Sequence, residues 1–398
     1  MTERRPIILV TGANSGVGFG VCHRLLVQLS QKSPPDASPE AQKHPIASPD
    51  DEISPFVPAD GLTLILACRS AQRAETARTN LYKLIDKEIA KSNTAHAQLF
   101  RKNLDIEIVK LDLSSVESVF ECAADIPVYH HLILNAGVGD FVGINWPLAI
   151  WEVCTRFKTA VTAPGFKIQA TGKMSSSATR NARSQPLSSS RVLWTTSLEG
   201  RPSFFPGIDD YQLVSASHSY EASKYESELV ACALDELESE RNNGVRHLAV
   251  HPGVAGTNIF WNIPGGFWIK SCFLHFTFGV GQARLFGSKH HPIQTYKAAI
   301  SVVHVALVSL AVLPSLTTFG ATNEKSGQPP EGVSGGNEKR SRAEDYSPVR
   351  YGAETNIFGT GYVGVQPVEG YEEHREVGRE LVARCNRLYN AFEKKFKM

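Results

Sequence analysis

Short apolar runs alternate with amphipathic stretches along the first third of the chain. Residues 6–10 (PIILV) form one such run, a glycine-rich turn follows at residues 11–18, and apolar residues then recur at helical spacing over residues 19–29. Similar apolar runs occur at residues 62–68, 106–111 and 132–134. Short continuous runs of this kind are typical of strands that are buried on both faces of a parallel sheet. The pattern predicts an α/β fold, a doubly wound parallel sheet in a single domain with polar inserts.

The turn at residues 11–18 (TGANSGVG) connects the first predicted strand to the first predicted helix. Glycines at such a point let the backbone approach a pyrophosphate, and the N-terminus of the helix favours its negative charge. We predict a dinucleotide site formed by Gly12, Asn14, Ser15, Gly16, Val17 and Gly18. The alternative is an ordinary tight turn in which glycine serves only the backbone conformation.

Polar residues follow each of the next three predicted strands. Arg69 follows the second strand, Asp112 the third and Asn135 the fourth. Ligands of open α/β sheets lie at the carboxyl ends of the strands, so we expect these residues to face the cofactor. A site for NAD carries Asp or Glu after the second strand, whereas an arginine there pairs with the 2'-phosphate of NADP. The sequence therefore favours NADPH, and the alternative for Arg69 is a solvated cation.

Tyr220 and Lys224 stand four residues apart in the stretch YEASK. On a helix this spacing places both side chains on one face. An ammonium group beside a phenol favours the phenolate and so lowers the tyrosine pKa toward the range of a proton donor. Ser197 lies upstream as a candidate hydrogen-bond donor. A solvated helix face is the alternative, and the glycine turn earlier in the chain argues against it.

These motifs together resemble the short-chain dehydrogenase/reductase family, which has a Rossmann-type fold. The matching segments are TGANSGVG at 11–18, LDLSS at 111–115, NAG at 135–137, TTS at 195–197, YEASK at 220–224 and HPGVAGT at 251–257. The resemblance implies that Tyr220 is the acid/base, that Ser197 binds the substrate carbonyl and that Lys224 binds the nicotinamide ribose. It also implies further cofactor contacts, with adenosine by Asp112 and Asn135, and with the nicotinamide end by Pro252, Gly253 and Thr257.

Other segments resemble the fungal 3-ketosteroid reductases of ergosterol synthesis within that family. They lie at residues 144–149, 194–199, 251–254, 362–365 and 372–376. This resemblance implies NADPH-dependent reduction of a 3-keto sterol to a 3-beta-hydroxy sterol during C-4 demethylation. It further implies other enzymes of the C-4 demethylation complex as partners, and a place on the endoplasmic reticulum membrane surface or a lipid droplet. The alternatives are a cytoplasmic location and another lipid or small carbonyl as the substrate.

One part of the family pattern is missing. Before the predicted strand at residues 191–194, the family has a long helix that carries a catalytic Asn and much of a homodimer interface. Residues 171–190 (TGKMSSSATRNARSQPLSSS) have no amphipathic period there, and Asn181 is the sole Asn among them. A third hypothesis is therefore a catalytically impaired relative, or a gene product lacking the Asn-bearing helix.

The chain is longer than the recognisable core because of polar segments. We predict a reductase domain at residues 1–316 with surface or disordered inserts at about 31–58 and 171–190, an insert at 317–349, and a C-terminal segment at 350–398 that packs on the same domain. The inserts are rich in Pro, Ser, Gly and charged residues, a composition that buries too little apolar area to offset ordering.

Composition narrows the choice of partners. The net charge is +1, from 41 basic and 40 acidic residues, which gives no indication of a nucleic-acid surface. The seven cysteines show no metal-ligand spacing and are expected to be free thiols. Residues 298–316 are nearly all apolar, and we favour a core helix there over a membrane span. The aromatic-rich residues 259–286 suit a sterol or peripheral contact with a membrane.

Overall fold

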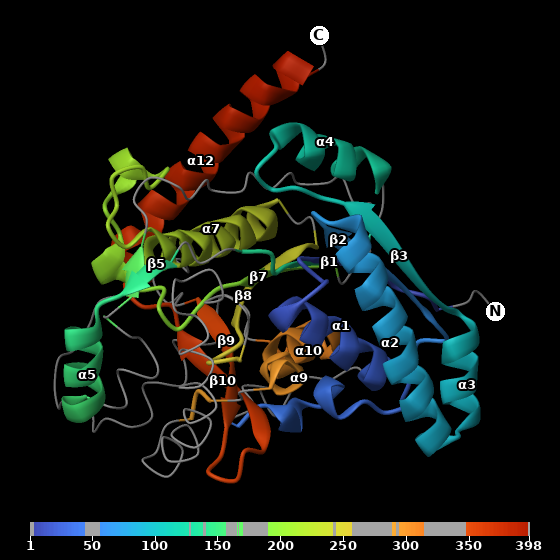
Figure 1. The fold of residues 1–398 in the computed structure, drawn as a ribbon. Coiled ribbons are helices and arrows are strands. Elements are labelled where there is room, and N and C mark those ends of the chain that lie inside the picture. Colours follow the sequence, from blue (N-terminus) through green and yellow to red (C-terminus); the bar gives the residue numbers. More distant parts are fainter. Residues whose placement is uncertain are drawn as a thin grey trace, which may run out of the picture.

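A central sheet of eight strands organises the molecule (Figure 1). The computed structural model describes residues 4–43, 56–126, 129–137, 141–156, 165, 167–169, 190–241, 244–256, 289–291, 294–313 and 348–396. The strand order is β10-β9-β8-β7-β4-β1-β2-β3, and every neighbouring pair is parallel except β9 and β10. The strands are β1 (Ile7–Thr11), β2 (Leu62–Cys68), β3 (Leu104–Lys110), β4 (His131–Leu134), β7 (Arg191–Thr195), β8 (Arg246–His251), β9 (Val349–Thr355) and β10 (Gly361–Pro367).

Helices cover both faces of this sheet. On one face lie α1 (Gly16–Leu29), α2 (Ala71–Ser92), α3 (Ala95–Lys102), α9 (Thr295–Ala298) and α10 (Ile300–Leu307). On the other lie α4 (Val116–Asp125), α7 (Ser219–Glu240) and α12 (Tyr371–Phe396). Short 3-10 turns occur at Pro35–Ala37, Pro39–Ala41, Pro202–Phe204, Ile208–Asp210 and Leu310–Val312. The predicted doubly wound sheet is confirmed, with one antiparallel edge strand added.

Strand β1 shows how the sequence sets this arrangement. Successive side chains of a strand point to opposite faces, so a strand buried on both faces needs apolar residues throughout. Ile8 and Val10 pack in the same cluster as Leu25 of α1. Leu9 packs instead with Cys122 of α4. The continuous apolar run is therefore explained by two separate cores, one on each side of the sheet.

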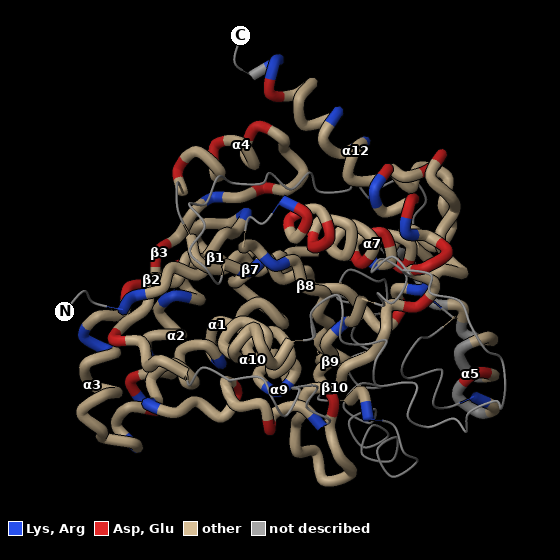
Figure 2. Tube along the Cα trace, turned by 180° about the vertical axis from the view of Figure 1, so that it is seen from behind, with Lys and Arg blue, Asp and Glu red and all other residues tan. Residues whose placement is uncertain are grey.

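Buried ion pairs fix helix α7, which carries the YEASK motif. Asp and Glu residues recur along this helix (Figure 2), and several of their side chains are buried. Glu228 lies 3.0 Å from Arg350 of β9, and Asp235 lies 2.9 Å from Arg246 of β8. Unpaired, these carboxylates would be costly to bury, so the arginines of the neighbouring strands stabilise the position of α7. The first turn of the helix thus lies at the carboxyl edge of the sheet.

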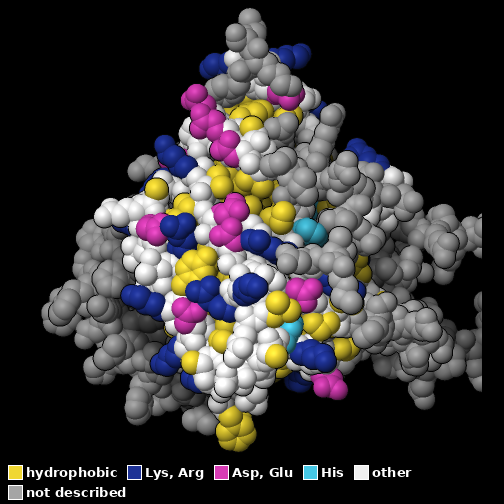
Figure 3. Space-filling view, turned by 90° about the vertical axis from the view of Figure 1, so that its right-hand side faces the viewer, with side chains coloured by type: hydrophobic (Ala, Val, Ile, Leu, Met, Phe, Trp, Pro, Cys, Tyr) yellow, Lys and Arg dark blue, Asp and Glu magenta, His cyan; other side chains and the backbone are white. Residues whose placement is uncertain are grey.

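The C-terminal segment packs on the same domain. Strands β9 and β10 extend the sheet beside β8, and α12 packs along α7. Farther along α12, the ring of Tyr389 stacks on Phe120 of α4 with ring centres 5.3 Å apart. The face that carries α2 and α3 shows Lys and Arg side chains interspersed with Asp and Glu (Figure 3). Five described cysteines, Cys22, Cys68, Cys122, Cys232 and Cys385, are free thiols.

The first part of the predicted insert at 31–58 differs from expectation. Residues up to Lys43 pack on the domain, and Asp36 and Gln42 are buried. Arg24 of α1 binds Asp36 through two hydrogen bonds of 2.5 and 2.8 Å. The Gln42 amide donates to Nε2 of His304 (2.9 Å), whose Nδ1–H donates to the Asp36 carbonyl (2.7 Å). The prediction of a loose polar insert is wrong for this part, because partners distant in the sequence satisfy its polar groups.

Replacing Asp36 with Ala should destabilise the protein by about 3–5 kcal/mol, because Arg24 would remain as a buried charge without its partner. The Arg24 side chain is only 11% exposed. The free energy of unfolding in urea measures the loss. Glu40→Ala, which removes an exposed acid from the same segment, should change stability by less than about 0.5 kcal/mol. Equal effects of the two substitutions would contradict the proposed anchoring of this segment.

The apolar stretch at 298–316 forms a core helix over its described part. Residues 300–306 of α10 are buried, and Val302, Val303 and Val305 belong to the main core. His304 is held by the insert, as described above. The prediction of a core helix is confirmed. Within the described ranges, the structure contains no helix long and apolar enough to cross a membrane.

The connection between β4 and β7 is described only in pieces. It contains β5 (Phe141–Ile144), α5 (Trp146–Thr155) and β6 (Lys167–Gln169), and β5 and β6 pair as a small antiparallel sheet. Residues 170–189, with Asn181, lie outside the described residues, as do all of residues 259–286 and residues 317–347 of the predicted insert. On the sheet face between α4 and α7, Leu134 and Val192 are partly buried.

Candidate active site

The glycine turn is held close to the residues that follow the carboxyl end of β4. Gly12 and Gly16 have φ values of 66° and 56°, a conformation that disfavours other residues. The Gly12 N–H donates to the Ala67 carbonyl at 2.8 Å. A Cβ at Gly12 would come within 3.0 Å of the Cα of Ala136, so only glycine leaves this approach open. Ser15 precedes α1 without a capping hydrogen bond from its side chain, which leaves the first N–H groups of α1 for a ligand.

Asn135 supports this turn from the end of β4. Its side-chain amide donates to the Thr11 carbonyl at 3.0 Å, and its backbone N–H donates to Thr11 Oγ1 at 2.9 Å. A Cβ on Gly18 would overlap both this amide and the Gly12 carbonyl. Asn135 and Gly18 thus fix the depth of the turn. The backbone of Asn14 also hydrogen-bonds to the Cys68 thiol, which joins the turn to β2.

Arg69 and Asp112 lie at the ends of neighbouring strands. Arg69 is exposed just after β2, so its guanidinium is accessible to a phosphate. Asp112 accepts from the backbone N–H (3.0 Å) and the hydroxyl (2.7 Å) of Ser114. These hydrogen bonds, with a smaller contribution from Arg69, hold the pKa of Asp112 below its usual value. Asp112 is therefore an ionised acceptor beside a cation.

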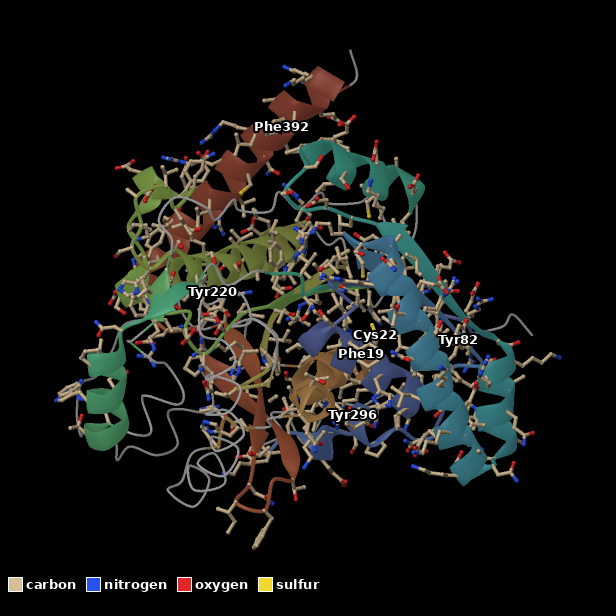
Figure 4. The ribbon with its side chains drawn as sticks, viewed as in Figure 1. Phe19, Cys22, Tyr82, Tyr220, Tyr296 and Phe392 are labelled. Atoms are coloured by element: carbon tan, nitrogen blue, oxygen red, sulfur yellow. The ribbon has the colours of Figure 1, made fainter. Side chains whose placement is uncertain are left out.

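Tyr220, Ser197 and Lys224 converge at the N-terminal end of α7 (Figure 4 labels Tyr220 there). The side chains of Tyr220 and Ser197 hydrogen-bond to each other. Lys224 Nζ lies 5.8 Å from the centre of the Tyr220 ring and donates to the Thr195 carbonyl at 2.9 Å. A Cβ at Gly137 would lie 3.5 Å from the same ammonium, so Lys224 also borders the NAG turn. The structure thus brings together the three predicted catalytic residues.

The pKa of Tyr220 differs from the sequence-based expectation. Burial raises it above the usual value, Glu199 and Glu221 raise it further, and the Ser197 hydrogen bond lowers it. Burial also lowers the pKa of Lys224 to about 8, against the opposing effect of Glu228. The net shift of the Tyr220 pKa is therefore upward, opposite to the lowering expected from Lys224, and the phenol stays protonated at neutral pH.

The predicted nicotinamide end lies after β8. The Gly253 N–H donates to Nδ1 of His251 at 3.3 Å, and the His251 carbonyl accepts from Ser301 of α10 at 3.0 Å. Pro252 lies between them and is half-buried. Thr257 lies outside the described residues. The end of β8 therefore borders the same edge of the sheet as the glycine turn.

Four polar residues beside Tyr220 were not predicted as site residues. Lys167 and Gln169 come from β6, Glu199 follows Ser197, and Glu221 follows Tyr220. Lys167 lies in a segment without a recognisable motif, so no signal in the sequence could have identified it. Glu199 and Glu221 lie beside motif residues, and only the fold shows that they are close together.

A parallel sheet, a glycine turn at its carboxyl edge and a Ser, Tyr and Lys trio together match the arrangement expected of a short-chain dehydrogenase/reductase. The chain is 27% identical to the 3-keto-steroid reductase of Aspergillus fumigatus, over 78% of this chain and 74% of that protein. Identity to the 3-keto-steroid reductase of Schizosaccharomyces pombe is 28%, over 76% of this chain and 82% of that protein. These relatives, all named as reductases, confirm the predicted resemblance and support an oxidoreductase.

The similarity to a human protein covers less of this chain than the similarity to the two fungal proteins. The human protein is a 3-keto-steroid reductase/17-beta-hydroxysteroid dehydrogenase 7, 26% identical over 65% of this chain and 68% of that protein. Among solved structures, an L-sorbose reductase from Gluconobacter frateurii with NADPH and L-sorbose has a TM-score of 0.41 at 14% identity, covering 77% of this chain and 91% of that one. No protein-family model matches the chain.

Proposed function

We propose that this protein is an NADPH-dependent reductase that converts a 3-keto sterol to a 3-beta-hydroxy sterol in the C-4 demethylation of ergosterol biosynthesis. The observation that carries the proposal is the convergence of Tyr220, Ser197 and Lys224 beside the glycine turn. The similarity to 3-keto-steroid reductases along most of the chain supports the choice of substrate.

The residues present suit a dinucleotide. The approach at Gly12, the uncapped start of α1 and the exposed Arg69 offer a backbone cradle and a cation for its phosphates. Lys224 borders the NAG turn and would bind the ribose next to the nicotinamide. NADPH supplies the hydride when it is bound.

The chain's own residues would supply the proton and the electrostatic stabilisation. Tyr220 is protonated at neutral pH and would give its proton to the oxygen of the substrate carbonyl as negative charge develops there. Ser197 would donate a hydrogen bond to the same oxygen, an effect of a few kcal/mol in comparable sites. Lys224 is largely protonated at neutral pH and loses its charge as the pH rises through about 8. Its cation would orient the ribose below that pH.

Turnover of a 3-keto sterol with NADPH tests the proposed substrate. A panel containing other lipid ketones and small carbonyl compounds separates the sterol from the alternative substrates. We expect the sterol to have the highest kcat/KM, with a 3-beta-hydroxy product. Preference for another ketone would be consistent with a reductase but would overturn the proposal that its substrate is a sterol.

Replacing Arg69 with Ala should weaken the binding of NADPH by roughly tenfold or more and leave NADH nearly unchanged, because only the 2'-phosphate loses a charge-assisted partner. Binding constants for both cofactors, measured at one salt concentration, check this. Arg78→Ala removes a half-buried arginine of α2 that pairs with Glu75 and should leave both affinities unchanged. An equal loss for NADPH and NADH in Arg69→Ala would sink the NADP assignment.

We also propose a peripheral location on the endoplasmic reticulum membrane surface or a lipid droplet, with the other enzymes of sterol C-4 demethylation as partners and a homodimer as the assembly. The aromatic composition of residues 259–286 and a water-insoluble substrate motivate this location. Fractionation of cells that express the tagged protein tests it, and recovery in the cytosol alone would support the cytoplasmic alternative.

A further inference from the structure

A buried cluster of charged groups lies beside Tyr220. Lys167 Nζ is 2.6 Å from both carboxylate oxygens of Glu199 and 3.2 Å from Oε1 of Glu221. The exposed fractions of these three side chains are 4%, 13% and 6%. The same ammonium lies 5.5 Å from the centre of the Tyr220 ring, a distance similar to that of Lys224. Tyr220 therefore has two lysines beside it.

Strand β6 is attached directly to the start of α7. Gln169 Oε1 accepts the backbone N–H of Tyr220 at 2.9 Å, and the Gln169 amide donates to Glu221. The Ser219 hydroxyl donates to the same Gln169 oxygen at 3.4 Å. These contacts hold Lys167 against the first turn of the helix.

The cluster also reaches Ser197. The backbone N–H of Glu199 donates to Ser197 Oγ at 3.2 Å, and Ser197 hydrogen-bonds to Tyr220. Through Glu199 and Glu221, Lys167 thus links the segment that carries Ser197 to the helix turn that carries Tyr220. A shift of either carboxylate would change the distance between the two groups that bind the substrate oxygen.

Charge gives this link a second effect. Two carboxylates beside a phenol disfavour the phenolate and so oppose proton donation, and one ammonium between them offsets part of that field. The pKa of Glu221 shows this balance, because burial raises it while Lys167 and Gln169 lower it to below its usual value. Without Lys167, the two buried carboxylates next to Tyr220 would lose the ammonium that they share, and Glu221 would keep the Gln169 amide.

We propose that Lys167 is a positioning residue for the reaction: its ion pairs with Glu199 and Glu221 hold Ser197 and Tyr220 in register and offset the negative field on the phenol. The inference rests on the proposed reductase function. It assigns a role to the connection between β4 and β7, in which the family resemblance implies an Asn-bearing helix.

The test compares Lys167→Met, Lys167→Arg, Glu199→Gln and the double variant Lys167→Met/Glu199→Gln. Lys167→Met should lower kcat by roughly tenfold or more and raise the apparent pKa of Tyr220 by about one unit. Glu199→Gln should shift that pKa in the opposite direction. The double variant should recover much of the loss in kcat, and Lys167→Arg should retain more activity than Lys167→Met. Lys91→Met, which removes an exposed lysine on α2, is the control and should change nothing.

Two readouts keep the inference separate from the proposed function. The pH dependence of kcat reports the reaction, and the ultraviolet absorbance of the phenolate, with the Tyr220→Phe spectrum subtracted, reports Tyr220 without any substrate. Opposite pKa shifts in Lys167→Met and Glu199→Gln support the inference even in a protein that reduces no ketone tested, an outcome that overturns only the proposed function. If the pKa of Tyr220 does not move in Lys167→Met and kcat stays within twofold of the parent, the inference is overturned. It is also overturned if the double variant is no more active than Lys167→Met. If Lys167→Met fails to fold, Glu199→Gln alone decides the test. In that case the absence of a downward shift in the pKa of Tyr220 overturns the inference.

Discussion

Tyr220→Phe should lower the turnover of a 3-keto sterol by at least about 10²-fold, because the substitution keeps the ring and removes the acid that faces Ser197 and Lys224. Affinity for NADPH should stay within a few-fold of the parent, since the phosphate contacts lie at the glycine turn and Arg69. Steady-state kinetics and cofactor titration on the same preparation measure both quantities.

Tyr389→Phe is the matched control, because its hydroxyl donates to Glu393 on the same helix, α12. It should leave turnover unchanged. If Tyr220→Phe also stays within a few-fold of the parent, the assignment of the acid is wrong. If the parent itself does not reduce the sterol, and a version carrying the Asn-bearing helix of a close relative does, the chain is the catalytically impaired relative considered from its sequence.

Gly18→Ala should weaken NADPH binding by roughly tenfold or more. The new Cβ would overlap the Gly12 carbonyl and the Asn135 amide, so the turn that receives the pyrophosphate must move. Overpacking of this kind typically costs about 1–3 kcal/mol, and each 1.4 kcal/mol lost in binding corresponds to about a tenfold change in affinity. Calorimetric titration with NADPH gives the affinity, and thermal unfolding shows whether the fold is retained.

Gly361→Ala provides the comparison, because its Cβ would meet Ile300 at 3.6 Å, an ordinary van der Waals distance. This substitution should leave the affinity for NADPH unchanged. Normal NADPH binding by a folded Gly18→Ala protein would show that the turn does not bind the pyrophosphate, whatever the role of Tyr220.

The fold and the pairing of Tyr220 with Lys224 follow from local features of the sequence. The apolar runs that became β1, β2 and β4 are continuous because both faces of those strands are buried. Tyr220 and Lys224 could be paired from the sequence because four residues complete about one helical turn. The glycine turn was predictable for a similar reason, since positive φ values at Gly12 and Gly16 depend on local backbone geometry.

Long-range pairing explains the parts that the sequence did not reveal. Strand β9 was missed because buried polar residues break its apolar pattern, and Arg350 among them pairs with Glu228 of α7. Asp36 gave the appearance of a solvated insert because Arg24 and His304, its partners, lie elsewhere in the chain. In each case the polar group is buried because tertiary structure supplies the opposite charge or the hydrogen bond.

The sequence by itself determined the parallel sheet, the glycine turn at its edge and the pair of Tyr220 and Lys224, because each depends on residues close together in the chain. Ser197 was assigned from the family resemblance. Only the tertiary structure decided the electrostatic environment of Tyr220. The pKa of that phenol depends on burial and on Glu199, which the fold brings to it, and Lys167 reaches the cluster from β6. Coulomb interactions depend on distance in space and on the surrounding dielectric, and neither quantity can be obtained from spacing along the chain.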